Sequence, residues 1–257
     1  RHHLDPGLDV DRAAGIDGYF PGWKKPMRDP GLKIPARPRT LIPLIRHLSR
    51  PVTMLLLKTP FTANQATFIS LLFGLFAAYC FFEGGYRYGI LGGVFLFLNY
   101  LLDNCDGEIA RAKNLSSRFG HEFETVVDWV VHTALFAAMG QGAHAQTGQI
   151  IWLWFGLAAA AGGTINYALS LYWKWRDGLG EFEPVMVNPD AGAAAEYKDF
   201  KTVLIVAFRE LARADFWAIV LALALLDWMR YLLPLAAVGA QVYWILGSTV
   251  RDEDHHV

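Results

Sequence analysis

The chain has 257 residues, of which 54% are hydrophobic and 14% aromatic, and its mean hydropathy is positive. This composition is too apolar for a water-solvated domain of that size, and it favours an integral membrane protein. The formal net charge is only −1, but the charged residues are strongly segregated along the sequence.

The first 60 residues divide into two segments. Residues 1–40 are rich in Pro, Gly and charge, which predicts an irregular cytoplasmic segment. In residues 41–60, "LIPLIRHLSRPVTMLLLK" repeats apolar residues at helical spacing, while Arg46, Arg50 and Lys58 mark another face. This pattern predicts an amphipathic juxtamembrane helix on the inner leaflet, broken near Pro51. An alternative is that it simply leads into the first membrane span.

Residues 61–250 contain six candidate spans. Four are uncharged runs close to the roughly 20 residues that cross a bilayer core, and two are less clean. We therefore expect an all-α integral membrane protein with six transmembrane helices after the juxtamembrane helix. The candidate spans are residues 66–82, 88–102, a stretch that ends near 142, 149–173, 214–226 and 231–250.

The basic residues predict the orientation of these spans. With the amino terminus inside, the inner segments carry 21 Lys or Arg and the outer segments carry 2. This bias places both termini in the cytoplasm, and the expected location is the inner membrane of a bacterial or archaeal cell. The longest inner segment after the first span, residues 174–214, is cytoplasmic on this topology. Its end has a helical pattern over 200–216, which predicts a second surface helix, although a plain linker fits equally well.

The stretch "DNCDGEIARAKNLSSRFGHEFETVVD" at 103–128 concentrates acids beside the apolar spans. At 100° per residue, one helix face carries Asp103, Asp106, Gly107, Ala110 and Arg111. After a turn in which Ser116 or Ser117 can cap the next helix, a second stripe repeats every four residues. Two antiparallel helices would bring the acids of both stripes together. The second stripe is Gly120, Glu124, Asp128 and His132.

Four clustered carboxylates repel one another unless a cation compensates their charge. Oxygen ligands favour Mg²⁺, Mn²⁺ or Ca²⁺ over zinc, and four carboxylates suffice for one or two ions. Gly107, Ala110 and Gly120 leave the helix faces bare for a group beside the metal, and Arg111 can fork onto a phosphate. His132 fits a packed histidine better than a ligand. The alternative for each acid is a helix-end charge paired with a nearby Arg or Lys.

The stretch resembles the signature of the CDP-alcohol phosphotransferase family, Asp-x2-Asp-Gly-x2-Ala-Arg-x8-Gly-x3-Asp-x3-Asp. All spacings agree, and one position departs, because Glu124 stands where the family pattern has Asp. The segment "TPFTANQATFISLLFGLFAAY" also looks like the family, although Ala63 precedes Asn64 where many members have Pro.

The resemblance implies that a CDP-linked alcohol donates its phospho-alcohol group to a hydroxyl acceptor and that CMP is released. It implies two Mg²⁺ or Mn²⁺ ions held by Asp103, Asp106, Glu124 and Asp128, with Asp128 also the general base. It further implies that Asn64, Gly107, Ala110, Arg111 and Gly120 bind the donor. The donor is CDP-diacylglycerol or a CDP-linked small alcohol, and the acceptor a lipid or small alcohol. The resemblance also implies a homodimer. The expected partners include membrane lipids but no nucleic acid.

Two other functions stay open at this point. A cation transporter would also place acids in the membrane, but it does not explain the glycines and Arg111 at their spacings. A catalytically weakened family member could act as a membrane partner, and Glu124 is the only support for that hypothesis. Basic residues such as Arg118, Lys174 and Arg176 could receive a phosphorylated acceptor, or could be solvated charges of the inner face.

Overall fold

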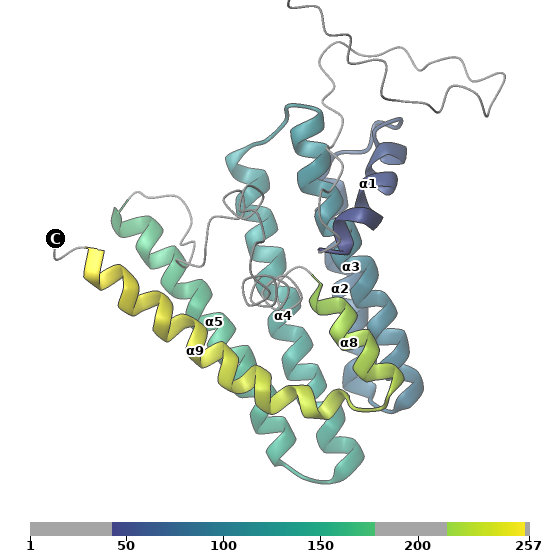
Figure 1. The fold of residues 1–257 in the computed structure, drawn as a ribbon, viewed down its shortest axis with the longest axis vertical. Helices are drawn as coiled ribbons and strands as arrows, with labels where there is room; N and C mark the ends of the chain where they lie inside the picture. The colour runs from purple at the N-terminus through teal and green to yellow at the C-terminus, as the bar shows by residue number, and fades with distance from the viewer. Residues whose placement is uncertain (1–42, 178–214, 255–257) are drawn as a thin grey trace, which may run out of the picture. The chain divides into compact units, whose positions relative to one another are not determined.

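The structure is a computed structural model that describes residues 43–177 and 215–254. Every regular element in these ranges is a helix, which confirms the predicted all-α class (Figure 1). The predicted irregular segment 1–40 and nearly all of the predicted surface helix 200–216 lie outside the described residues. The elements are α1 (Ile45–Leu56), α2 (Ala63–Glu83), α3 (Tyr86–Ala112), α4 (Arg118–Thr147), α5 (Ile151–Asp177), α8 (Phe216–Leu225), the 3₁₀ turn η2 (Met229–Tyr231) and α9 (Leu232–Asp254).

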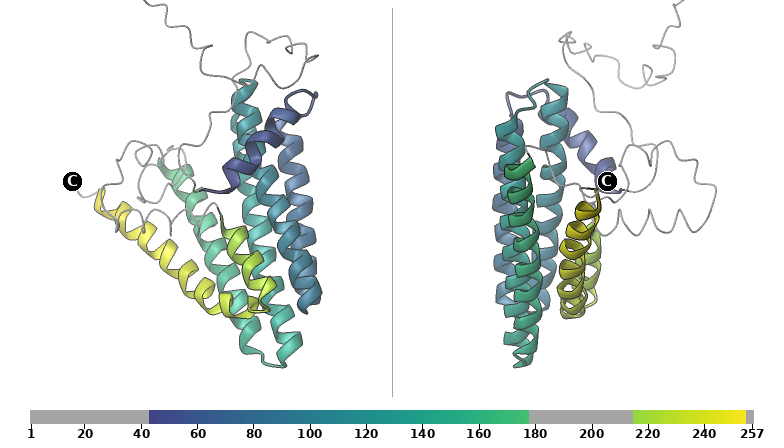
Figure 2. Two further views of the ribbon diagram at one scale, coloured as in Figure 1. Left: turned by 45° about the vertical axis from the view of Figure 1, so that its right-hand side comes forward. Right: turned by 90° about the vertical axis from the view of Figure 1, so that its left-hand side faces the viewer.

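The helices α2 to α5 follow one another in alternating directions and are joined by short turns (Figures 1 and 2). Helix α2 packs against α3 and α4, α4 packs against α5, and α5 packs against α9. Helix α3 also contacts α1 and α8. The alternation brings the first residues of α2 and α4 and the last residues of α3 to one end of this helix group. The acidic stretch of the sequence lies at that end.

Small residues allow the helices to approach one another closely. At Gly156 of α5, an added Cβ would lie 2.7 Å from the Cα of Gly140 in α4. No side chain fits between these two backbones, so both positions require glycine. Contacts of this kind are typical of helix packing in membranes, where small residues let the backbones approach closely and van der Waals packing drives the association.

Helix α1 is continuous through Pro51, so the predicted break there is wrong. Proline removes one backbone donor, but the helix is held by other contacts in the turns before it. The buried carboxylate of Asp215 accepts hydrogen bonds from the backbone N–H groups of Leu44 (2.7 Å) and Ile45 (2.9 Å). One turn before Pro51, the Ser49 hydroxyl donates to Oε1 of Glu108 in α3 at 2.8 Å.

Only one described helix, α2, is both long and apolar enough to cross a membrane by composition alone, and α8 is a shorter apolar helix. One such helix is weak support for a membrane location. Each of the six segments that the sequence analysis assigned to spans nevertheless contains one described helix, namely α2, α3, α4, α5, α8 or α9.

Candidate functional site

A tight turn between α3 and α4 aligns the two acidic stripes. Asn114 ends α3 with a positive φ of 52°, and the N–H groups of Asn114 and Leu115 donate to the carbonyls of Arg111 (3.3 Å) and Ala110 (2.9 Å). This is the Schellman arrangement, in which Asn tolerates the left-handed conformation. Ser117 then caps α4 by accepting from the N–H of Gly120 at 3.0 Å, which confirms the predicted cap.

The turn brings three of the four predicted metal ligands together. Carboxylate oxygens of Asp103 and Asp106 from α3 and of Glu124 from α4 lie within 4.8 Å of one another. Asp128 is exposed and does not belong to this group of three, but it lies close enough for its charge to act on Asp103 and Asp106. We call these four residues the acid cluster.

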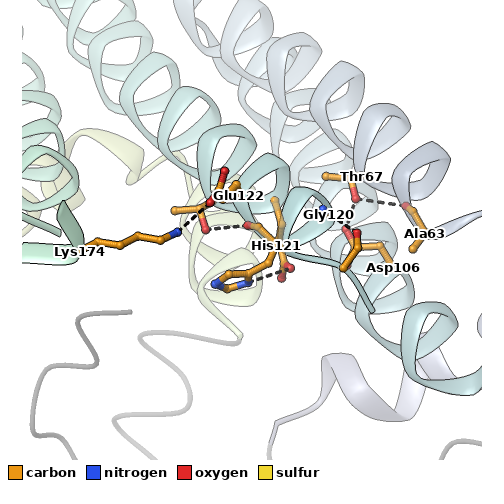
Figure 3. Close-up of polar contacts among 10 residues, drawn as sticks. Ala63, Thr67, Asp106, Gly120, His121, Glu122 and Lys174 are labelled. Carbon is orange, nitrogen blue, oxygen red and sulfur yellow. Dashed lines mark hydrogen bonds and ion pairs between the residues drawn. The ribbon is translucent and has the colours of Figure 1, made fainter. Parts of the chain in front are cut away.

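Asp106 is the most deeply buried member of the acid cluster, with 3% of its surface exposed. Its Oδ2 accepts a hydrogen bond of 2.6 Å from the hydroxyl of Thr67 in α2 (Figure 3). Its Oδ1 is also buried and has no hydrogen-bond partner within the described part of the chain. A buried carboxylate oxygen without a partner is costly, so this atom calls for a ligand that supplies positive charge or a proton.

Thr67 is a site residue that the sequence analysis missed. It lies three residues after Asn64, so both side chains lie on neighbouring positions of one face of α2. That spacing was readable, but only the contact between α2 and α3 shows that Thr67 faces Asp106.

The predicted donor-binding residues also gather at this end of the helices. An added Cβ at Gly120 would lie 3.3 Å from Oδ1 of Asn64, so the glycine admits this side chain. An added Cβ at Gly107 would lie 3.1 Å from a guanidinium nitrogen of Arg111, which is therefore positioned over the glycine. Ala110 lies on the same face of α3, half-buried. The bare helix face at Gly107 is thus occupied by the side chain of Arg111.

Several basic residues near the acid cluster bind elsewhere. Lys113 donates to the carbonyls of Thr59 (3.3 Å) and Phe61 (2.7 Å), which secures the connection between α1 and α2. Arg118 Nε contacts Oε1 of Glu122 at 2.9 Å. Lys174 Nζ contacts the same oxygen at 3.2 Å (Figure 3). The carboxylate of Glu122 therefore lies between two cations that the sequence analysis considered for acceptor binding.

Glu124 itself contacts a residue of its own helix. Nδ1 of His121 lies 3.9 Å from Oε2 of Glu124, and both side chains are about two-fifths exposed, at 43% and 41%. The residue that departs from the family signature is therefore partly open to solvent, whereas Asp106 is enclosed.

The carboxylates gathered at the end of α3 and the start of α4 supply oxygen ligands of the kind that bind divalent cations. Proteins that act on phosphate groups commonly use a divalent cation bound in this way. The chain belongs to the CDP-alcohol phosphatidyltransferase family, whose sequence pattern matches residues 61–243. This family is membrane-associated and transfers a phosphoalcohol group from a CDP-alcohol to an alcohol acceptor in lipid synthesis. Members of this family are transferases of phosphate-containing groups.

One curated relative is the "Bifunctional IPC transferase and DIPP synthase" of Aquifex aeolicus (strain VF5). It is 36% identical to this chain over 97 residues, which make up 37% of the chain and 22% of the relative. The match therefore covers less than a quarter of the relative's length.

Proposed function

We propose that the protein transfers a phospho-alcohol group from a CDP-linked alcohol to a hydroxyl acceptor, with a divalent cation bound by the acid cluster, and releases CMP. The observation that carries this proposal is the group of three carboxylates within 4.8 Å, drawn from two helices at the spacings of the family signature. Within that group, Oδ1 of Asp106 is buried and has no hydrogen-bond partner among residues 43–177 and 215–254.

The residues of the acid cluster fit Mg²⁺ or Mn²⁺, because all their donor atoms are carboxylate oxygens. Asp103, Asp106 and Glu124 would hold the metal, and Asp128 would complete the ligand set for a second ion. When bound, the metal would offset the charge of the diphosphate and of the departing CMP. The hydrogen bond from Thr67 would orient the Asp106 carboxylate, as outer partners of metal ligands commonly do.

Asp128 is the proposed general base. It is the exposed member of the acid cluster, so an acceptor hydroxyl can reach it, and the hydroxyl proton would pass to its carboxylate. The acceptor oxygen would form a bond to the phosphorus of the phospho-alcohol group as the bond to CMP breaks. Arg111 would hold a phosphate of the donor. Asn64 and Gly120 would contact the nucleotide from the side of α2. No covalent enzyme intermediate is needed.

The topology we propose is six spans formed by α2, α3, α4, α5, α8 and α9, with the acid cluster facing the cytoplasm. Helix α1 supports a position at the membrane surface, because it buries two polar side chains against the protein and leaves large apolar side chains exposed. Ser49 and Thr53 are fully buried against the protein, whereas Leu55 is 63% exposed and Leu48 is 42% exposed. Apolar residues that face away from the protein are suited to lipid. A homodimer and a domain boundary near residue 60 remain parts of the same proposal.

Release of CMP tests the reaction. Purified protein in detergent, with Mg²⁺ or Mn²⁺, should release CMP from at least one of CDP-diacylglycerol, CDP-choline, CDP-ethanolamine and CDP-inositol when an acceptor alcohol is present. Chelation of the metal with EDTA should abolish the release, and added Mg²⁺ should restore it. Absence of turnover with every donor, together with absence of CDP binding, would contradict the enzyme proposal.

Asp128→Asn tests the assignment of the base. Amide replaces carboxylate at nearly the same volume, so we expect turnover to fall by at least about 100-fold while CDP binding persists. Asp227→Asn makes the same chemical change in the exposed connection after α8, outside the acid cluster, and should leave turnover unchanged. If Asp128→Asn turns over normally, the base has been assigned to the wrong residue.

Neither the acid cluster nor the comparisons support the two alternative functions. A cation transporter would distribute its acids along a pathway. Three of these acids instead converge on one point, beside Arg111 and the two glycines. A family member that only served as a membrane partner would release no CMP, which the same assay examines.

A further inference from the structure

On the side of the acid cluster away from the α3–α4 turn, α3 and α4 are joined by a hydrogen bond between two side chains. The hydroxyl of Tyr100 lies 3.1 Å from Nε2 of His132, and the two rings meet edge to face at 75°. Tyr100 lies one helical turn before Asp103 in α3, and His132 lies one turn after Asp128 in α4. The pair therefore lies one turn further from the α3–α4 turn than the acids Asp103 and Asp128, whose charges act on Tyr100.

The direction of hydrogen bonding in this pair follows from a second contact. Nδ1 of His132 lies 2.8 Å from the backbone carbonyl oxygen of Asp128. A carbonyl oxygen only accepts, so Nδ1 carries a proton and the ring is held toward the backbone of α4. In the neutral ring Nε2 is then the acceptor, and the hydroxyl of Tyr100 donates to it. Both ring nitrogens are thus engaged, which fixes the orientation of the imidazole.

The Tyr100–His132 pair and the α3–α4 turn lie on opposite sides of the acid cluster. The turn at Asn114 and Ser117 joins the two helices on one side, and the pair joins them on the other. The carboxylates between these two connections repel one another, and this repulsion tends to separate the helices. Tyr100 is only 8% exposed and packs in the apolar core, so the position of its hydroxyl is fixed. The hydrogen bond of this hydroxyl to His132 therefore resists separation of α3 and α4.

We propose that Tyr100 and His132 are positioning residues that set the separation of α3 and α4, and through it the affinity of the acid cluster for a divalent cation. This inference rests on the proposed function, because it assigns a role toward the metal site described there. Neither residue touches the reacting atoms. Their effect is to keep the ligands of two helices at binding distance before the metal arrives, which lowers the cost of organising the site.

Binding of Mn²⁺ to the purified protein without substrates tests the proposal, with free Mn²⁺ measured by electron paramagnetic resonance. Tyr100→Phe keeps the ring and removes the hydroxyl, and we expect it to raise the Kd for Mn²⁺ about 10-fold, the effect typical of losing an outer partner of a metal site. His132→Asn places its amide near Nδ1 and cannot reach Tyr100, so it should weaken binding equally. His132→Gln extends an amide oxygen toward the position of Nε2 and should stay within about twofold of the unaltered protein.

The double variant distinguishes a shared contact from two separate effects. If the pair acts through one hydrogen bond, Tyr100→Phe combined with His132→Asn should bind Mn²⁺ no more weakly than either single variant. Thr164→Val is the matched control, because it removes the partner of Trp129 Nε1 (3.2 Å), a hydrogen bond of α4 toward α5. Its Kd for Mn²⁺ should equal that of the unaltered protein.

The outcomes separate this inference from the proposed function. If Asp106→Asn abolishes Mn²⁺ binding while Tyr100→Phe and His132→Asn bind normally, the metal site stands and the positioning role is overturned. The positioning role is also overturned if Thr164→Val weakens binding as much as Tyr100→Phe, since the effect would then be general destabilisation. If the unaltered protein binds no Mn²⁺, or Asp106→Asn binds it normally, the metal site itself fails and the positioning role fails with it.

Discussion

Glu124 shows how a single side chain can depart from a family signature and still contribute its charge. Its carboxylate reaches the same 4.8 Å group as Asp103 and Asp106, although it begins on a different helix. Glutamate is longer than aspartate by one methylene, and it carries the same negative charge at position 124.

We predict that charge matters more than length at position 124. Glu124→Gln removes one negative charge from the proposed metal site, so turnover should fall by at least about 100-fold, as for a lost metal ligand. Glu124→Asp keeps the charge and withdraws it by roughly an ångström, and we expect a loss of no more than about 10-fold. Steady-state CMP release at saturating Mg²⁺ measures both, and normal activity of Glu124→Gln would show that this residue is not a ligand.

At the scale of the element, α1 depends on residues far away in the sequence. Its own Leu44 provides no capping side chain, and Asp215, at the start of α8, supplies the acceptors instead. A carboxylate at this position also interacts favourably with the positive end of the helix dipole. Helix α1 is thus fastened at its first turn to α8 and near its middle to Glu108 of α3.

Replacement of Asp215 should loosen α1. Asp215→Ala leaves the N–H groups of Leu44 and Ile45 without their acceptors, at a cost of about 1–3 kcal/mol in the free energy of unfolding. Asp215→Asn keeps one amide oxygen and should cost less. In thermal unfolding in detergent, the unaltered protein should have the highest midpoint temperature, Asp215→Asn a lower one and Asp215→Ala the lowest. Equal midpoints for all three proteins would mean that the fully buried Asp215 does not hold α1.

The helices themselves were predictable from sequence, because hydrophobic runs and caps act over a few residues. Ser117 was anticipated as a cap, and the stripes of acids on α3 and α4 follow from helical periodicity. The wrong prediction at Pro51 has the opposite origin, since proline's local effect was outweighed by tertiary contacts that the sequence pattern does not contain. Asn114 lies in the turn predicted between the two acidic stripes, and Asn tolerates the positive φ that this turn requires.

At the scale of the whole molecule, the acid cluster lies at the end of the helices where the basic residues of the sequence predict the cytoplasm. Ser116, in the α3–α4 turn, and Gln149, in the α4–α5 turn, are both exposed and lie at opposite ends of α4. The proposed topology places them on opposite sides of the membrane.

Labelling of single cysteines tests this topology. In a background of Cys80→Ala and Cys105→Ala, a membrane-impermeant maleimide should label Gln149→Cys on intact cells. It should label Ser116→Cys only after the membrane is permeabilised. Labelling of both positions from the same side would contradict the six-span arrangement.

The sequence by itself determined the helical class, the faces on which the acids lie and the resemblance to a family, because all three depend on periodicity and spacing within short segments. Tertiary structure decided which partners meet across helices. Thr67 with Asp106, Tyr100 with His132 and Asp215 with the start of α1 are pairs separated by 39, 32 and about 170 positions. Such contacts depend on how whole helices pack, and a pattern repeated every three or four residues carries no information about them.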